Sequence, residues 1–361
     1  MHALSFHAGP RALAHLRDHG LRARDVAVIP AAAGGPKGLI FQALDQWLFG
    51  QWLPQAPRER ALIGSSIGAW RMAAACHADP AAAFARLGQL YCGQRYTAKP
   101  DQHEIDLVCQ QLLADFIGGH EDEVVNHPQH RLHLLTNRGM RGLADPRHRG
   151  HEALGFAAAS LLNLASRERL AHMLERVVVS AGGNAPHWLS PSFDKFTTHF
   201  SALNRANLGA ALLASGTLPL IMKPVRGIAD APPGTYWDGG IIDYNLALPY
   251  SRIGEGELVL YPHFTEHIVP GWLDKSLPWR RAARGANRGW LDNVIIAAPT
   301  PEFLRLLPLG KLPDRKDFKY YGLDHDARIR AWKQAIGEGG RLRDAFAAFA
   351  ARPDPALVRP L

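Results

Sequence analysis

Apolar residues in this chain of 361 residues come first in short unbroken runs and then at helical spacing. Residues 25–33 (DVAVIPAAA) form a run without polar alternation, which is typical of a buried strand. The turn GGPKG follows, and the apolar spacing of residues 39–53 predicts a helix. A second run, 60–64, leads through another glycine-containing turn into the alanine-rich segment 69–77, which is expected to be helical. Two successive strand–turn–helix units indicate an α/β fold with a mostly parallel sheet.

Further segments continue this pattern along the chain. An amphipathic helix is expected before residue 25, and residues 80–130 are expected to be mainly helical. The predicted strands are 131–137, 176–182 and 257–264, and a strand–turn–strand unit is predicted at 235–245; the predicted later helices are 203–216, 327–336 and 341–351. Proline and arginine increase after about residue 265 while the periodicity weakens. We therefore predict a main domain, 1–264, and a C-terminal extension, 265–361, that packs on it or caps it.

The composition is that of a globular protein in a reducing compartment. Hydrophobic residues make up 47% of the chain and charged residues 20%, which excludes an intrinsically disordered chain. No apolar run of about 18 residues or more predicts a membrane span, and the N-terminus lacks the pattern of a secretory signal peptide. Three widely spaced cysteines (Cys76, Cys92 and Cys109) form neither a metal motif nor a disulfide framework. A cytoplasmic location is expected.

The net charge of +8 raises the question of an anionic partner. Basic residues are densest at 137–151 and 279–290, and neither stretch contains a nucleic-acid-binding motif. No nucleic-acid partner is therefore expected. Solvated loops are the commoner explanation of such stretches, and transient contact with an anionic membrane surface is the alternative.

The first candidate for chemistry is the sequence Gly64-Ser65-Ser66-Ile67-Gly68, which has the form G-x-S-x-G. In a nucleophile elbow this motif lies between a strand and a helix, and the strained turn exposes the hydroxyl of the central serine. The flanking glycines avoid clashes of a β-carbon in so tight a turn. Ser66 is thus the candidate nucleophile and Ser65 a structural turn residue. The alternative is a chance match in a turn of small residues.

The second candidate is the turn that contains Gly34, Gly35, Lys37 and Gly38. Backbone N–H groups of a glycine pair after a strand can approach a ligand closely and form an oxyanion hole. A phosphate-binding Walker loop is excluded because Gly38, and not Ser or Thr, follows Lys37. A dinucleotide fingerprint is excluded because Ala33 stands at its first glycine position. A tight connection without chemistry is the remaining alternative.

The third candidate is Asp238-Gly239-Gly240, which lies between aromatic and aliphatic residues. A carboxylate in such an apolar setting needs a partner, so Asp238 is the candidate base for a serine proton. A simple Asp-Gly turn is the commoner explanation of the dipeptide. A Ser-His-Asp triad is the rival, with His263 as the best-placed histidine.

Together, AGGPKG, GSSIGA, ASGTLPLIMKPV (214–225) and DGGIIDYN resemble the patatin-like phospholipase family in residues 25–250. The resemblance implies a three-layer α/β/α fold of modified α/β-hydrolase type, with 1–264 as its catalytic domain. It also implies a serine–aspartate dyad, with Ser66 as nucleophile and Asp238 as base, that hydrolyses acyl esters of lipids without a metal or an organic cofactor. The implied loop and supporting positions are Gly34, Gly35 and Gly38 for the oxyanion hole, and Lys37, Gly64, Gly68, Gly239 and Gly240 around them.

Two departures from the family pattern change what is expected of the site. Ala33 replaces the usual first glycine of the loop, which affects the loop geometry although alanine keeps an N–H group. Asp243 places a second carboxylate near Asp238, and repulsion between them, if they are close, raises the pKa of one. Besides the Ser-His-Asp esterase, the alternatives are a non-catalytic lipid-binding protein on the same fold and an acyltransferase with the same dyad.

Overall fold

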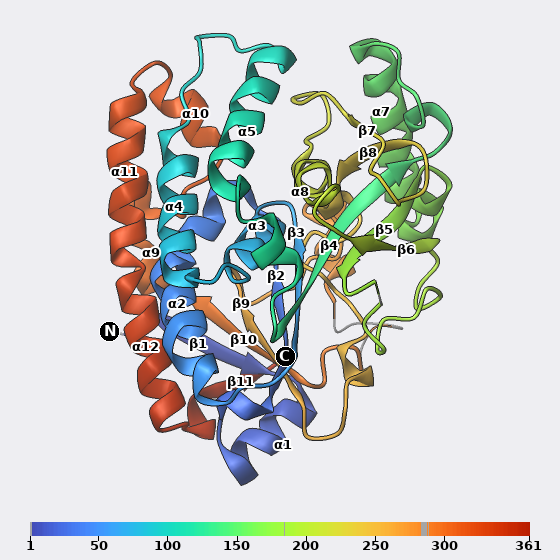
Figure 1. Cartoon of the computed structure of the whole chain (residues 1–361). Coiled ribbons are helices and arrows are strands. Elements are labelled where there is room, and N and C mark those ends of the chain that lie inside the picture. The colour runs from blue at the N-terminus through green and yellow to red at the C-terminus, as the bar shows by residue number, and fades with distance from the viewer. Residues whose placement is uncertain (1, 184, 283–286, 288) are drawn as a thin grey trace.

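One eleven-stranded sheet runs through the molecule (Figure 1). The computed structural model describes residues 2–183, 185–282, 287 and 289–361. Its strands are β1 (Leu4–Ala8), β2 (Val26–Ala31), β3 (Arg60–Ser65), β4 (His130–Gly139), β5 (Leu174–Ala181), β6 (Thr198–Leu203), β7 (Val225–Arg226), β8 (Thr235–Asp238), β9 (Leu258–Pro262), β10 (Val294–Pro299) and β11 (Val358–Pro360).

The centre of the sheet is parallel. The order is β11-β1-β10-β9-β2-β3-β4-β5-β6, and β8 pairs with β4 and with β7. Neighbouring strands from β10 to β4 are parallel, whereas β1 against β10, β5 against β4 and β8 against β4 are antiparallel. Because β2 and β3 are parallel neighbours, with Ala31 paired to Gly64, the turns that follow them lie side by side at one edge of the sheet.

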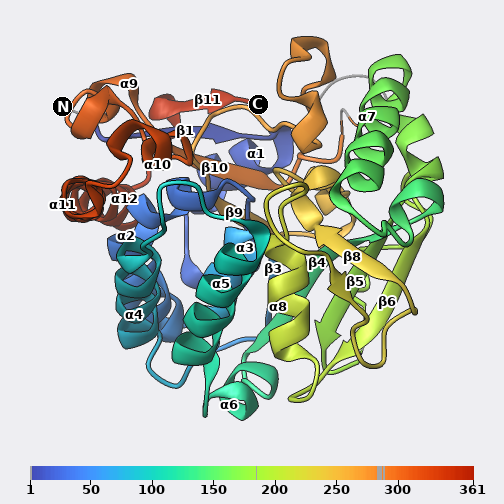
Figure 2. The same ribbon diagram turned by 90° about the horizontal axis from the view of Figure 1, so that it is seen from above.

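Helices cover both faces of the sheet. The helices are α1 (Pro10–His19), α2 (Gln42–Trp47), α3 (Ile67–Ala74), α4 (Pro80–Gly93), α5 (Gln102–Ile117), α6 (Glu121–Val125), α7 (Arg149–Ala165), α8 (Leu208–Gly216), α9 (Pro301–Leu304), α10 (Lys316–Tyr321), α11 (His325–Glu338) and α12 (Gly340–Ala351). Figure 2 shows α7 and α8 on opposite sides of β4 and β5. The predicted α/β fold with a mostly parallel sheet is confirmed. Among the described helices, none is long and apolar enough to span a bilayer.

The strand–turn–strand prediction for residues 235–245 is wrong in its second half. β8 ends at Asp238, a 3-10 turn (Gly239–Ile241) follows, and residues 242–245 form no strand. The N–H groups of Tyr244 and Asn245 donate to the carbonyls of Pro270 and Val269. This segment therefore satisfies its backbone against a loop instead of a neighbouring strand.

Other boundaries also differ from those predicted. β1 precedes the expected N-terminal helix. Within the segment 203–216, which is expected to be helical throughout, Leu203 is the last residue of β6, and helix α8 begins only at Leu208. In the segment 39–53, 3-10 and π turns flank the short helix α2. The 3.6-residue apolar spacing persists through these turns, so the pattern does not reveal the change of helix type.

Residues 265–361 do more than pack on a finished domain. β10 lies between β1 and β9 in the sheet, and all six of its residues are buried. α12 packs on α2 and β1, where Phe349 stacks on Phe6 with 3.9 Å between ring centroids. The boundary predicted at residue 264 therefore passes through the middle of one sheet and one hydrophobic core.

Candidate active site

Ser66 occupies a strained turn between β3 and α3. Its φ of 56° and ψ of −128° lie where residues other than glycine rarely stay. A β-carbon on Gly64 would lie 2.5 Å from the Ala69 nitrogen, and one on Gly68 would lie 1.8 Å from the Ala31 oxygen. Both glycines of the motif are thus required by the close approach of the helix to the sheet. The turn has the geometry of a nucleophile elbow.

A second serine holds this turn from behind. The N–H of Ser66 donates to Oγ of Ser215 at 2.9 Å, and that hydroxyl donates to the carbonyl of Leu135 at 2.7 Å. Ser215 is fully buried at the end of α8. It is a positioning residue within the segment ASGTLPLIMKPV (214–225), and the sequence pattern alone does not indicate this role.

Asp238 contacts the candidate nucleophile directly. Oγ of Ser66 donates to Oδ2 of Asp238 at 2.8 Å, and the N–H of Gly240 donates to Oδ1 at 2.7 Å. Burial raises the pKa of Asp238 to about 6, and the bonds from Ser66 and Gly240 oppose this rise. Two residues 172 positions apart in the sequence are therefore joined, as the sequence predicted, in a serine–carboxyl pair.

The glycines after Asp238 allow this strand end to fit. A β-carbon on Gly239 would lie 2.2 Å from the carbonyl oxygen of Leu135, and one on Gly240 would lie 2.7 Å from the β-carbon of Ala33. The Asp-Gly-Gly sequence thus lets the carboxyl-bearing turn lie directly against β4 and against the first glycine-rich loop.

His263 takes no part in this pair. Its ring is fully buried, stacks on Phe264 and interacts through Nδ1 with the carbonyl of Thr265. Burial lowers the pKa of His263 to about 3, so the imidazole is neutral. Neither ring nitrogen is hydrogen-bonded to Ser66 or Asp238 among the described residues, and His263 does not line the cavity at the dyad.

Asp243 is paired with Arg176, which also pairs with Asp194 at 2.8 Å. Arg176 donates to both carboxylate oxygens of Asp243, at 2.6 and 3.0 Å, and both side chains are buried. Repulsion from Asp243 is therefore not what raises the pKa of Asp238; desolvation is the main cause. The second carboxylate is a structural member of a buried ion pair.

Only part of the glycine-rich loop faces the dyad. Gly34 and Gly35 line the same cavity as Ser66 and Asp238, and Gly35 has a φ of 58°. The N–H of Ala33 donates to the carbonyl of Tyr244 at 2.9 Å, whereas those of Gly34 and Gly35 donate no hydrogen bond within the described part of the chain. These two groups are the loop's available donors for an oxyanion.

Gly38 and Lys37 lie behind the loop. A β-carbon on Gly38 would lie 3.1 Å from Cδ of Arg71, whose guanidinium is paired with the buried Asp45 at 2.8 Å. Neither Gly38 nor Lys37 lines the cavity. Nζ of Lys37 lies 5.0 Å from the ring centroid of Phe264. Gly38 thus makes room for packing behind the loop, and its predicted place in the oxyanion hole has no support from the cavity.

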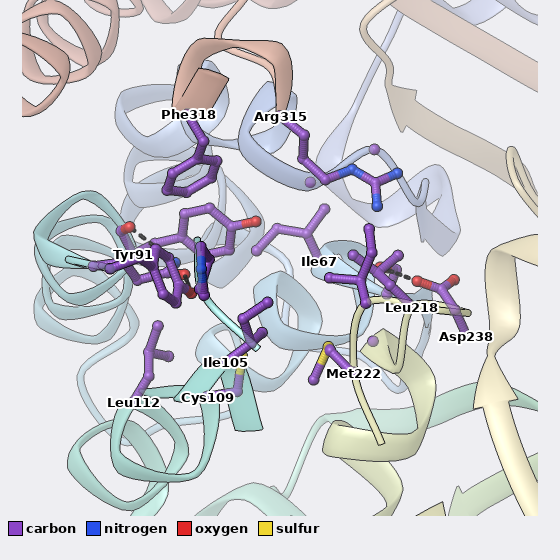
Figure 3. Close-up of a pocket in the computed structure, with 18 of the residues that line it drawn as sticks. Ile67, Tyr91, Ile105, Cys109, Leu112, Leu218, Met222, Asp238, Arg315 and Phe318 are labelled. Atoms are coloured by element: carbon purple, nitrogen blue, oxygen red, sulfur yellow. Dashed lines mark hydrogen bonds between the residues drawn. The ribbon is translucent and has the colours of Figure 1, made fainter. Parts of the chain in front are cut away.

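A cavity of about 530 Å³ opens from the dyad (Figure 3). Figure 3 shows Asp238 and Arg315 at one end and Tyr91 and Leu112 at the other. Between and around them the lining is mainly apolar, and it comes chiefly from α3, α5, α8 and α10: Ile67, Trp70, Ile105, Cys109, Leu112, Leu213, Leu218, Met222 and Phe318. The volume is that of a small-molecule site, and the lining suits a hydrocarbon chain.

One cluster away from this cavity has metal-ligating residue types. Ligand atoms of His77, His120 and Glu123 lie within 4.8 Å of one another. Arg86, however, approaches Nδ1 of His77 at 3.4 Å and Nε2 of His120 at 3.1 Å. A guanidinium in contact with both imidazoles opposes the binding of a metal cation there.

The two basic stretches are partly engaged in ion pairs. Arg138 in the first pairs with Glu175 at 2.7 Å, and Arg280 in the second pairs with Asp274 at 3.1 Å. Residues 283–286 and 288 of the second stretch lie outside the described residues.

Comparison with known proteins adds no relative to this description. A scan of protein-family models and a search of curated protein sequences each found no match to the chain.

Proposed function

We propose that this protein is a serine acyl hydrolase of the patatin-like kind, with a three-layer α/β/α fold, acting on acyl esters of lipids. The observation that carries the proposal is the 2.8 Å hydrogen bond from Ser66 to Asp238 at a strained strand–helix turn. A dyad of this type supplies a nucleophile and a base, and the N–H groups of Gly34 and Gly35 supply donors for the oxyanion.

The first half of the proposed reaction forms an acyl-enzyme. Asp238 takes the proton of Ser66 while Oγ attacks the carbonyl carbon of the ester. The negative charge on the carbonyl oxygen is stabilised by the N–H groups of Gly34 and Gly35 and by the N-terminus of α3. The carbon–oxygen bond to the alcohol then breaks, and the alcohol leaves with the proton from Asp238.

The second half restores the serine. Asp238 takes a proton from a water molecule, whose oxygen attacks the acyl carbon. Collapse of the second tetrahedral intermediate releases the carboxylic acid and returns the proton to Oγ of Ser66. Neither a metal nor an organic cofactor is needed, because one carboxylate serves as base in both halves.

The apolar cavity supports a lipid substrate over a short polar ester. Burial of each methylene group of an acyl chain contributes about 0.8 kcal/mol, and the lining beyond the dyad offers such burial along α5 and α8. We therefore propose that the acyl chain lies in the cavity, between Ile105 and Leu213, with the ester carbonyl at Ser66.

The test is hydrolysis of a p-nitrophenyl ester and of a monoacylglycerol by the wild type and matched variants. Ser66→Ala and Asp238→Asn are expected to lower kcat by at least about 1000-fold. Ser65→Ala is the control, since this adjacent buried hydroxyl has no hydrogen-bond partner among the described residues, and it is expected to remain active. His263→Gln is expected to keep most of the activity.

Other outcomes would favour the alternatives. Loss of activity in His263→Gln, with its fold intact by circular dichroism, would favour a Ser-His-Asp esterase. Hydrolysis by Ser66→Ala at the wild-type rate would contradict the proposed nucleophile. A wild type that hydrolyses neither ester but binds the monoacylglycerol would favour a lipid-binding protein, and acyl transfer to added glycerol in place of water would favour an acyltransferase.

A further inference from the structure

Cationic side chains gather at the dyad end of the cavity. Arg315, just before α10, lines the cavity, and its guanidinium carbon lies 5.4 Å from the ring centroid of Trp272. Nζ of Lys275 lies 5.7 Å from the same ring and 3.9 Å from the ring centroid of Tyr244. Trp272 and Tyr244 also line the cavity. Trp272 thus lies within 6 Å of both cationic groups and Tyr244 lies against the ammonium of Lys275, which itself stands behind these rings and does not line the cavity.

These cations have no carboxylate partner of their own. Among the described residues, no Asp or Glu oxygen lies within 4.0 Å of the charged groups of Arg315 or Lys275. The nearby acids Asp314 and Asp317 are already paired with Lys311. Partial burial of the ammonium, and then repulsion from Lys37 and Arg315, lower the pKa of Lys275. The nearby Asp238 is their counter-charge, since it raises the pKa of Lys275 and both cations lower the pKa of Asp238. One carboxyl against several cations leaves an excess of positive charge that favours an anion from outside.

The position of the cations relative to the glycine loop indicates which part of a substrate they meet. Cγ of Arg315 would lie 3.7 Å from a β-carbon on Gly35, so its stem crosses the oxyanion side of the dyad. In Figure 3, Arg315 lies near Asp238 and well away from Leu112 at the apolar end. With the ester carbonyl at Ser66 and the acyl chain toward Leu112, the alcohol part of the ester points to the cations.

We propose that Arg315 and Lys275 form an anion subsite that binds a phosphate group on the alcohol part of the acyl ester. This inference rests on the proposed function, and it names the substrate class: acyl esters that carry a phosphate without an attached ammonium group. Arg315 binds phosphate through paired N–H donors and Lys275 as a point charge. A choline group beside the phosphate is disfavoured because it brings a third cation next to these two.

The experiment compares three substrates with the same acyl chain: a monoacylglycerol, the corresponding lysophosphatidic acid and the corresponding lysophosphatidylcholine. The wild type is expected to hydrolyse lysophosphatidic acid with the highest kcat/KM. Arg315→Gln and Lys275→Gln are each expected to raise KM for lysophosphatidic acid about ten-fold or more, the effect of one charge-assisted hydrogen bond. Their kcat/KM for the monoacylglycerol, which carries no phosphate, is expected to fall much less than that for lysophosphatidic acid.

A matched control removes one charge without touching the cavity. Lys316 is exposed, follows Arg315 directly in the sequence and does not line the cavity. Lys316→Gln is expected to leave the preference for lysophosphatidic acid unchanged. An equal loss on all three substrates in Arg315→Gln would show a role in the acyl-transfer chemistry or in folding and would overturn the subsite.

Binding to the Ser66→Ala protein separates this inference from the proposed function. Calorimetry is expected to show at least about ten-fold tighter binding of lysophosphatidic acid than of the monoacylglycerol, and loss of this difference when Arg315→Gln is added. Glycerol 3-phosphate, which lacks the acyl chain, is the probe for a free phosphate ester and is expected to bind weakly. Hydrolysis without any preference for the phosphate would refute the subsite alone. The binding preference without hydrolysis would refute the proposed function alone.

Discussion

Asp238 combines two requirements that conflict. In the proposed reaction its carboxyl must be ionised to accept the proton of Ser66, yet it is 4% exposed, and desolvation disfavours the charged form. The bonds from Ser66 and Gly240 recover part of this cost. Ionisation of this proposed base therefore destabilises the fold, a conflict that is common at functional sites.

The pH dependence of activity reports this carboxyl. Since Asp238 acts only when ionised and burial raises its pKa to about 6, kcat/KM for a neutral ester is expected to rise with pH up to about 6 and to level off above it. Initial rates between pH 4 and pH 9 measure this limb. A limb near pH 4, the value of a solvated aspartate, would contradict a buried base.

Asp238→Asn is expected to stabilise the fold while it abolishes activity. An aspartate whose pKa is raised in the folded state stabilises the fold below its unfolded pKa, and this contribution is lost as pH rises through about 6. Asp238→Asn has no ionisable group here, so at pH 8 its free energy of unfolding is expected to exceed that of the wild type by about 3 kcal/mol at most. Its Tm is expected to exceed that of the wild type at pH 8 and to approach it at pH 4.

Asp243→Asn is the control for this prediction. It removes a carboxylate of similar burial that is paired with Arg176; Arg176 keeps its second partner Asp194, so the loss of these charge-assisted bonds is expected to cost about 1.5–3 kcal/mol at pH 8. Thermal unfolding of both variants at the two pH values gives the comparison. Equal destabilisation by both substitutions would show that burial does not strain Asp238.

Ser215 is expected to act on rate through the backbone of Ser66. Ser215→Ala leaves the N–H of Ser66 and the carbonyl of Leu135 without their shared partner, which costs about 1–3 kcal/mol. We expect kcat to fall while KM for the same ester changes little, because the hydroxyl lies behind the turn. Ser215→Thr keeps the hydroxyl, and recovery of kcat in this variant would support positioning over a packing effect.

The elbow depends on how closely helix α3 approaches strand β2. The carbonyl of Ala31 occupies the space that a side chain on Gly68 would need, so the helix starts against the neighbouring strand. This contact packs the end of β2, the Ser66 turn and the glycine loop closely against one another. The parallel pairing of β2 and β3 brings these parts together, and the glycines permit the final approach.

Gly68→Ala is expected to disrupt the packing of α3 against β2. A methyl group 1.8 Å from a carbonyl oxygen forces α3 away from β2, with an expected cost of about 3 kcal/mol or more and loss of hydrolysis. Gly337→Ala is the control, because a β-carbon on this exposed glycine within α11 would meet nothing within 4 Å; it is expected to gain about 0.5–1 kcal/mol. Denaturant unfolding measures both changes, and equal values would contradict the packing argument.

The whole molecule is organised around a sheet that its first and last residues complete together. β1 is paired with β10 and with β11, and helices α11 and α12 pack beside α2 and α4. Arg315 and Phe318 bring the same C-terminal region to the cavity, and Lys275 lies against Tyr244, which lines it. The region after residue 264 thus contributes both to the core and to the proposed substrate site.

Truncation tests whether residues 1–264 fold without the C-terminal region. A fragment of residues 1–264 lacks β10 between β1 and β9, so it exposes two buried strand edges and is expected not to fold cooperatively. A fragment of residues 1–354 loses the 3-10 turn Pro355–Leu357 and β11, at the edge of the sheet, and is expected to fold with reduced stability. Circular dichroism with thermal melts distinguishes them. Cooperative melting and ester hydrolysis by fragment 1–264 would support a separate catalytic domain.

The sequence by itself determined the features that depend on local backbone geometry. Apolar runs, glycine-containing turns and the order of the motifs predicted β2, β3, α3 and the Ser66–Asp238 pair, because strand periodicity and tight turns require particular residue types. The strand predicted after Asp238 is wrong because burial alone does not reveal the partner of the backbone. A buried apolar sequence is the same whether its backbone is hydrogen-bonded to a strand or to a loop.

Tertiary structure alone decided what depends on contacts between distant residues. The apolar stretch that forms β10 lies in a region of weak periodicity, and only its insertion between β1 and β9 makes it a core strand. Ser215 acquires its role from hydrogen bonds to Ser66 and Leu135, and burial sets the pKa values of Asp238 and His263. Partners, burial and charge clusters of this kind arise from the packing of separate segments, which no local pattern encodes.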